Sequence, residues 1–255
     1  MDSLSRNDLK NTLSLFKSIT LEEMDSVKLL DRTDTKYAFH IKKLPEVLNF
    51  VLNDYRLLVV NGTSFNRYKT LYFDTDKFDF YLKHHNERLN RLKVRFRSYV
   101  DTDLHFFEIK FKNNKDRTIK KRIPYPILEK TISGKALELL EELSPITDIK
   151  EKIWVNYTRL TFVSIDFSER VTVDLDLTYI EGENEISFPE LVIGEIKQNR
   201  MSHNSVFVRA MKNVGIHSIS ISKYCLGIIK LHPEIKHNTF KPKLRILNRI
   251  LNADS

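Results

Sequence analysis

Alternation of charged and apolar residues is the main pattern in this sequence. From about residue 31 to residue 198, side chains repeatedly switch character at every second position, which is typical of strands with two unlike faces. The pattern predicts eight strands, at about 31–40, 66–75, 89–99, 104–113, 116–124, 154–166, 169–179 and 190–198. With so many strands in order, we expect an α+β protein built around a closed eight-stranded antiparallel β-barrel.

Helical spacing appears before, between and after these strands. Residues 1–30 predict one or two helices, with Thr20 and Glu23 as a capping box. Further helices are expected near 45–53, 76–83, 133–143, 206–214 and 222–231, with Ser133 as the cap of its helix. We therefore divide the chain into an N-terminal helical segment (1–30), a barrel domain (31–232) and a basic C-terminal tail helix (233–255).

One face of the predicted strands is strongly basic. Strand 89–99 places four cations together, and the next two strands add more with a single acid among them: Arg91, Lys93, Arg95, Arg97, Glu108, Lys110, Lys112, Lys120 and Arg122. A solvated face normally mixes both signs, and like charges opposite one another destabilise a sheet. A bound polyanion would neutralise this cluster. Alternation alone does not tell whether the basic face points inward or outward.

Composition supports an anionic partner without identifying it. The 255 residues carry a formal net charge of +8 and one cysteine, Cys225, so no intramolecular disulfide can form. The N-terminus has no apolar run and no segment approaches the length of a membrane span, so we expect a cytoplasmic protein. The basic amphipathic tail could contact an anionic membrane surface, but we favour a packed C-terminal helix.

Nine short motifs occur in a characteristic order. They are Arg32–Tyr37, Tyr72–Thr75 followed by Tyr81, Arg91–Arg97, Phe107–Lys110, Lys120–Arg122, Tyr157–Arg159, Asp174–Asp176, Gly194–Lys197 and Ser222–Tyr224. In this order and spacing the sequence resembles the VTC domain, the polyphosphate polymerase branch of the triphosphate tunnel metalloenzymes. The resemblance runs from about residue 30 to residue 230.

The resemblance implies a tunnel with the charged faces inside. It implies that Arg95, Arg97, Arg159 and Lys223 are catalytic, and that a second group binds phosphate: Arg32, Lys36, Arg91, Lys110, Lys120, Arg122, Tyr157 and Lys197. Glu195 would hold a divalent ion, Mn²⁺ or Mg²⁺, since hard cations prefer carboxylate oxygens. The expected ligands are ATP and polyphosphate, with no nucleic acid; a membrane-protein partner stays open.

The sequence departs from the wider superfamily in its first strand. That superfamily often opens with Glu-x-Glu-x-Lys, whereas this chain has Arg32, Asp34 and Lys36. The change favours the polymerase branch over the triphosphatase and cyclase branches. Asp34 is expected to pair with a neighbouring cation, and Asp174 and Asp176 to share one face, as a metal ligand or as partners of arginines. The N-terminal phosphate-sensing domain and membrane spans of the eukaryotic polymerases are not expected here.

The leading hypothesis is therefore a metal-dependent polyphosphate polymerase that uses ATP. One alternative keeps the fold but hydrolyses inorganic or nucleoside triphosphate. Another is a non-catalytic module that binds polyphosphate or an inositol phosphate. RNA binding is disfavoured, because aromatic side chains do not alternate with the basic ones as a stacking platform requires. No glycine-rich phosphate loop is present, so ATP would be bound by side chains.

Overall fold

All eight predicted strands are found in the structure, which is a computed structural model describing residues 6–25, 33–115, 117–198 and 204–252. In chain order they are β2 (Thr33–His40), β4 (Asn66–Asp74), β5 (Arg91–Tyr99), β6 (Leu104–Lys112), β7 (Thr118–Tyr125), β8 (Lys150–Ser164), β9 (Glu169–Glu181) and β11 (Leu191–Gln198). Neighbours along the sheet follow the order β2-β11-β9-β8-β4-β5-β6-β7, and each of these pairs is antiparallel.

Three short strands were not predicted. β1 (Lys17–Ile19) pairs in parallel with β3 (Tyr55–Leu58), β3 also pairs with β8, and β10 (Asn184–Phe188) forms a hairpin with β9. Each has three to five residues. So short a segment shows too little alternation to stand out from a loop. The first 30 residues, expected to be helical, thus also contribute a strand.

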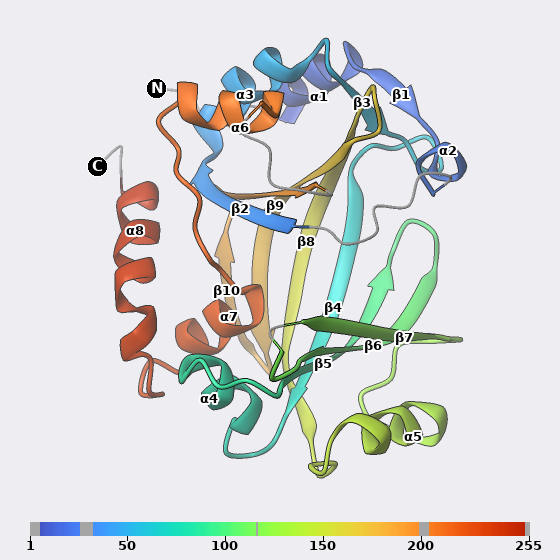
Figure 1. Cartoon of the computed structure of the whole chain (residues 1–255), viewed down its shortest axis with the longest axis vertical. Coiled ribbons are helices and arrows are strands. Elements are labelled where there is room, and N and C mark those ends of the chain that lie inside the picture. The colour runs from blue at the N-terminus through green and yellow to red at the C-terminus, as the bar shows by residue number, and fades with distance from the viewer. Residues whose placement is uncertain (1–5, 26–32, 116, 199–203, 253–255) are drawn as a thin grey trace.

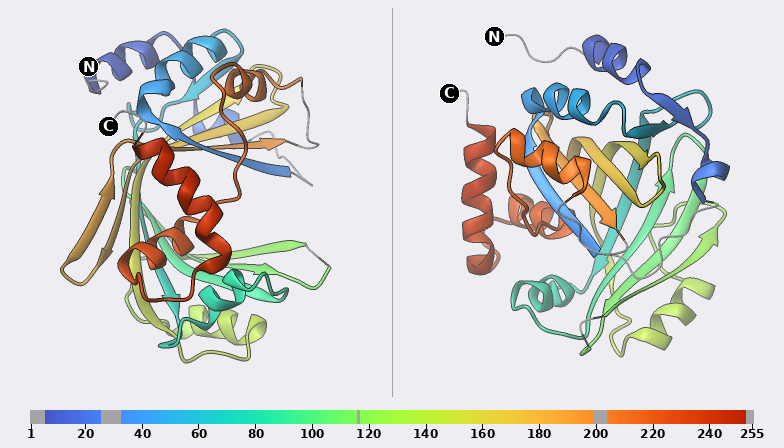
Figure 2. Two further views of the ribbon diagram at one scale, coloured as in Figure 1. Left: turned by 90° about the vertical axis from the view of Figure 1, so that its left-hand side faces the viewer. Right: turned by 45° about the horizontal axis from the view of Figure 1, so that its top comes forward.

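The expectation of a closed barrel is not met among the described residues. β2 and β7 are the two ends of the strand order and share no hydrogen-bonded ladder. The sheet instead curves into a trough, with β2 and β11 in one wall and β5, β6 and β7 in the other (Figures 1 and 2). Alternation fixes which face of a strand is basic, but it carries no information on whether the first and last strands meet.

Helices lie on both faces of the trough. They are α1 (Arg6–Ser14), α2 (Leu21–Asp25), α3 (Leu44–Val51), α4 (Asp79–His85), α5 (Gly134–Leu143), α6 (Val206–Asn213), α7 (Lys223–Leu231) and α8 (Lys241–Leu251), with 3₁₀ turns at Ile41–Lys43 and Asn238–Phe240. The capping box of α2 is confirmed: the Thr20 amide donates to Glu23 Oε2 (2.8 Å) and the Glu23 amide to Thr20 Oγ1 (3.2 Å). Ser133 is the N-cap residue of α5 as predicted, but its side chain makes no capping hydrogen bond.

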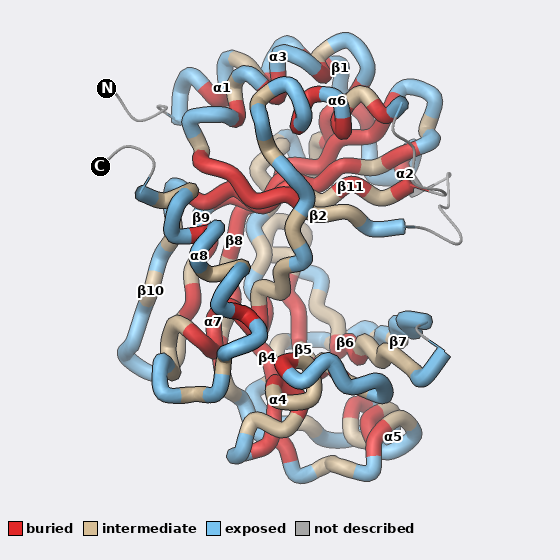
Figure 3. The backbone as a smooth tube through the Cα atoms, turned by 60° about the vertical axis from the view of Figure 1, so that its left-hand side comes forward, coloured by how far each residue is buried: buried red, intermediate tan, exposed pale blue. Residues whose placement is uncertain are grey.

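The apolar core lies mainly on the convex side of the sheet. Outward side chains such as Phe39, Phe162 and Val173 pack under α1, α3 and α6, while Phe96 and Phe107 pack with α5. On the concave side, α7 covers one end of the trough and packs against β8 and β9 (Figure 1). The buried central strands contrast with the exposed outer part of β7 in Figure 3. The basic faces are therefore the inner faces, which alternation had left open.

The described helices include none that is long and apolar enough to cross a bilayer.

Candidate functional site: a basic groove on the concave face

Three inward-facing carboxylates organise the cations of the groove, and each is on a different strand. Glu108 on β6 is fully buried. Its carboxylate lies 2.7 Å from Nε and 2.6 Å from Nη2 of Arg95, and forms ion pairs with Lys120 (2.5 Å) and Arg97 (3.8 Å). Burial alone would raise the pKa of Glu108, but these three cations hold it below its usual range. Glu108 thus stays ionised and fixes the orientation of the predicted phosphate-binding cations.

Asp174 on β9 organises a second group. Its carboxylate accepts two hydrogen bonds from Arg159 on β8 (2.6 and 2.8 Å) and forms an ion pair with Lys223 at the start of α7. Burial would raise the pKa of Asp174, whereas Arg159 and Lys223 lower it. Both oxygens of Asp174 are occupied by these donors, so of its two expected roles Asp174 has that of ion-pair partner to Arg159 and Lys223. Asp176 does not share its face as expected: a bulge against β8 leaves Asp176 exposed with φ +52°.

Glu195 on β11 is held far more loosely. Its carboxylate lies 3.7 Å from the ammonium groups of Lys36 and Lys197, and its side chain is 14% exposed. Burial would raise the pKa of Glu195, but Lys197 and Lys36 keep it below its usual range, so the group is ionised. Of the three groove carboxylates, Glu195 is the one with room on both oxygens for a new ligand.

This geometry fits a divalent cation held jointly with a phosphate ligand. Within the described ranges there is no cluster of three or more His, Cys, Asp or Glu side chains suited to a metal. Mg²⁺ is commonly bound by one or two carboxylates together with water and substrate phosphates. Glu195 meets that requirement, and the groove offers no all-protein cage.

One cation of the groove, Lys110, has no such counter-charge. The Lys110 ammonium has no carboxylate within ion-pair distance among the described residues. Burial and repulsion by Arg95, Lys93 and Lys36 lower the pKa of Lys110 to about 7, although Glu195 partly opposes this. Burial likewise lowers the pKa of Lys120 to about 8, against the attraction of Glu108. The groove therefore holds more positive charge than its own carboxylates neutralise.

Aromatic rings line the same face and brace the cations. Tyr157, predicted to hydrogen-bond a phosphate, is buried with the Arg159 guanidinium 5.2 Å and the Lys223 ammonium 4.9 Å from its ring centroid. Tyr68 stacks on Tyr157 at 5.1 Å. Tyr68 was not among the predicted site residues. It lies four positions before Tyr72 on β4, so both side chains are on one face of the strand, and this spacing was the available signal.

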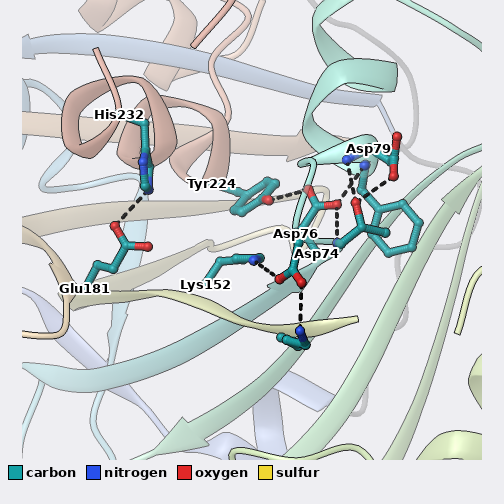
Figure 4. Close-up of polar contacts among 10 residues, drawn as sticks. Asp74, Asp76, Asp79, Lys152, Glu181, Tyr224 and His232 are labelled. Atoms are coloured by element: carbon teal, nitrogen blue, oxygen red, sulfur yellow. Dashed lines mark hydrogen bonds and ion pairs between the residues drawn. The ribbon is translucent and has the colours of Figure 1, made fainter. Parts of the chain in front are cut away.

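The start of α7 is anchored in the groove by three contacts. Ser222 caps the helix and accepts from Lys93 (3.0 Å), and Lys223 pairs with Asp174. The Tyr224 hydroxyl donates to Asp74 Oδ2 (2.6 Å), as Figure 4 shows. The same carboxylate accepts the backbone amides of Thr75, Phe80 and Tyr81, so it joins α4 to α7. Lys223 is thereby placed in the groove although it lies far along the chain from the strands.

The remaining predicted residues lie at the ends of the groove or outside the description. Arg91 donates to the Arg88 carbonyl at one end (2.9 Å). Arg122 is exposed near the other, where its guanidinium lies 4.7 Å from the Phe106 ring centroid. Arg32 falls outside the described residues. At the Arg122 end a cavity of about 540 Å³ is lined by Arg97, Lys120, Arg122, Arg159 and Lys197, among others.

The curved antiparallel sheet with its inward basic face defines an α+β protein with a basic groove on its concave side. The family model of the VTC domain matches residues 31–232, so the chain belongs to the VTC domain family. No curated protein matches the sequence.

Solved structures are similar to this chain at low sequence identity, and one of them has a TM-score above 0.5. One, from Hippeastrum, is a putative adenylyl cyclase reported to have a dominant triphosphatase activity; it is 11% identical, with a TM-score of 0.52 over 78% of this chain and 95% of that one. A putative adenylate cyclase from Vibrio parahaemolyticus is 13% identical, with a TM-score of 0.43 over 76% and 97%. The PH1819 protein from Pyrococcus horikoshii is 15% identical, with a TM-score of 0.43 over 78% and 99%.

Proposed function

We propose that this protein is a metal-dependent polyphosphate polymerase, which transfers the terminal phosphate of ATP to a phosphate chain lying in the basic groove. The observation that carries the proposal is the excess of positive charge in the groove: Glu108, Asp174 and Glu195 are outnumbered by the cations around them, and Lys110 has no ion pair to any of them. Keeping such a group in a folded protein is costly unless a ligand neutralises it. Membership of the VTC domain family supports phosphate chains as that ligand.

The groove supplies what phosphoryl transfer needs. Catalysis of this reaction consists mainly of positioning the reactants and stabilising charge on the phosphate oxygens. Arg95, Arg97, Arg159 and Lys223 are oriented by Glu108 and Asp174, so their donors are fixed before the substrate arrives. Glu195 would hold the divalent ion, which neutralises charge on the phosphate oxygens when bound.

No side-chain nucleophile is required in this scheme. A terminal oxygen of the phosphate chain forms a bond to the γ-phosphorus of ATP. The bond from that phosphorus to the β–γ bridging oxygen breaks, and ADP leaves with the electron pair. The cations of the groove keep the two reacting ends together despite their like charge.

The test is incubation of the purified protein with ATP, Mn²⁺ or Mg²⁺ and a short polyphosphate primer, followed by a gel that resolves chain length. We expect the chain to lengthen, and Lys223→Ala to abolish most of the lengthening. Lys230→Ala, in the same helix and 5.5 Å from the Phe188 ring rather than in the groove, is the matched control. Absence of lengthening by the wild type would overturn the proposal, as would unchanged lengthening by Lys223→Ala.

Hydrolysis of a triphosphate is the second candidate, and one observation favours it. A solved structure of similar fold, from Hippeastrum, is reported to have a dominant triphosphatase activity. Free phosphate measured in the same reaction separates the two functions. Release of phosphate from ATP or inorganic triphosphate without polymer would indicate a triphosphatase. Binding of phosphate chains with neither reaction would indicate a binding module.

A further inference from the structure

One end of the groove carries inward cations without an acid among them. β5 and β6 are paired in register, so their inward residues form successive rungs across the two strands. The two rungs nearest the start of β5 are Arg91–Lys112 and Lys93–Lys110, and these four side chains are half-buried. We call these four residues the basic end. Like Lys110, Arg91 and Lys93 have no carboxylate within ion-pair distance in the described part of the chain.

The first turn of α8 brings a further cation toward the basic end. The segment before this helix packs against α4: the Thr239 amide donates to His85 Nε2 (3.2 Å), and the Phe240 ring stacks on His84 with ring centroids 6.1 Å apart. The Lys243 ammonium lies 5.5 Å from the centroid of the same Phe240 ring. These contacts hold the start of α8 beside α4, which itself packs on β5 (Figures 1 and 2).

The charges of both groups act on His84. Burial lowers the pKa of this histidine to about 2, and so do four nearby cations: Lys93, Arg91, Lys243 and Lys112. The ring is therefore neutral, and its Nδ1 is a buried polar atom without a hydrogen-bond partner among the described residues. Buried polar atoms in folded proteins nearly always have a partner, so an orphaned one indicates a missing ligand or water. His84 thus marks a place where positive charge from α4, β5, β6 and α8 is concentrated.

A polyanion that spans the basic end and Lys243 accounts for this arrangement. Like charges held close together and partly away from water repel one another, and a bound anion removes that repulsion. A phosphate chain carries a charge on every unit, so a chain in the groove can continue over the basic end without a gap in its contacts. The family model ends at residue 232, so the resemblance assigns no role to Lys243.

We infer that α8 extends the binding surface for phosphate chains beyond the groove, through Lys243 and the orphaned ring nitrogen of His84. A long chain leaves the groove over the basic end and contacts α8, whereas a short chain is held by the groove alone. The inference rests on the proposed function and deepens it, because it states where the part of a long chain outside the groove lies.

The experiment measures, by calorimetry without ATP, the binding of a long polyphosphate and of tripolyphosphate, which the groove alone can hold. The variant is Lys243→Glu, and the matched control is Arg249→Glu, which makes the same change of charge at an exposed position near the other end of α8. We expect Lys243→Glu to bind the long chain about tenfold more weakly, with a smaller salt dependence. Its affinity for tripolyphosphate should stay within about twofold of wild type, which also reports that the groove is folded. Lys243→Arg should retain the affinity for the long chain.

Each other outcome overturns the inference. An unchanged affinity of Lys243→Glu for the long chain would show that α8 does not contact it. Equal losses in Lys243→Glu and Arg249→Glu would reduce the effect to net charge, and equal losses for both ligands would place it in the groove or the fold; the proposed function would stand in these cases. Binding to vesicles of anionic lipid that Lys243→Glu abolishes and polyphosphate does not compete for would make the surface a membrane site instead. Wild-type protein that binds neither phosphate ligand would refute the proposed function as well.

Discussion

At the scale of single residues, Lys110 shows how the groove is prepared for an anion. Its ammonium lies among Arg95, Lys93 and Lys36, and burial with this repulsion lowers its pKa to about 7. Part of the protein population therefore lacks this charge at neutral pH. A bound phosphate chain would stabilise the charged form and raise the pKa again, so binding should take up a proton.

This linkage predicts that affinity falls as pH rises. Between pH 6 and pH 8.5 the free protein loses the Lys110 proton that the bound state retains, so affinity for tripolyphosphate should drop by about thirtyfold from this group. Arginine stays charged throughout this range. The variant Lys110→Arg should therefore show a shallower pH dependence in calorimetry. Because both proteins bind the same ligand, titration of the ligand itself cancels in the comparison. Parallel pH profiles would contradict the assignment.

At the scale of elements, the contact of α7 with the sheet depends on a glycine. A Cβ atom at Gly227 would lie 2.4 Å from Tyr179 Cδ1 and 2.6 Å from Ile153 Cδ1, so the helix could not keep its present distance from β8 and β9. We expect Gly227→Ala to lower the free energy of unfolding by about 1–3 kcal/mol, measured by urea denaturation. Arg209→Ala, at an exposed position of α6, should change it little. Equal stability of the two variants would refute the close packing.

The bond from Tyr224 to Asp74 should matter for both stability and ligand binding. Asp74 is fully buried, so Tyr224→Phe removes a donor from a carboxylate that water cannot reach, at a cost of about 1–3 kcal/mol. Because Lys223 precedes this anchor, affinity for tripolyphosphate should fall too. Tyr81→Phe is the control, since its hydroxyl donates to the neutral Lys236 carbonyl (2.9 Å). If Tyr224→Phe loses stability but binds normally, the anchor does not position Lys223.

The sequence predicted strands well where the alternation of charged and apolar residues was long. It predicted poorly where a short strand or a bulge decided the structure. The cations of β5, β6 and β7 were assigned to one face, and the rungs of those strands confirm it. The prediction that Asp176 shares a face with Asp174 was wrong, because a bulge changes the direction of a side chain without changing its place in the sequence. Short strands such as β1 and β3 were not predicted because three or four residues show too little alternation to stand out from a loop. The cations lie farther from the Glu195 carboxylate than from those of Glu108 and Asp174. This difference could not be predicted from the sequence, since it depends on distances between strands.

At the scale of the whole molecule, curvature turns an ordinary alternating sheet into a binding groove. Each basic strand face alone would be compatible with a solvated surface. Bending the sheet brings the faces of β2, β8, β9 and β11 toward those of β5, β6 and β7, and the charges then share one concave space. Resemblance to a family identified this inward direction, but it also led to the expectation of a closed barrel, for which β2 and β7 provide no pairing.

The central claim is that the inward charges, and not the net charge of the protein, bind the phosphate chain. Lys120 and Lys121 test it directly, because they are adjacent, carry the same charge and point to opposite faces of β7: Lys120 pairs with Glu108 in the groove and Lys121 with Glu142 on α5. Calorimetry with tripolyphosphate at two salt concentrations should show that Lys120→Gln weakens binding by about tenfold and reduces its salt dependence, whereas Lys121→Gln leaves both unchanged. Equal losses in the two variants would contradict the account.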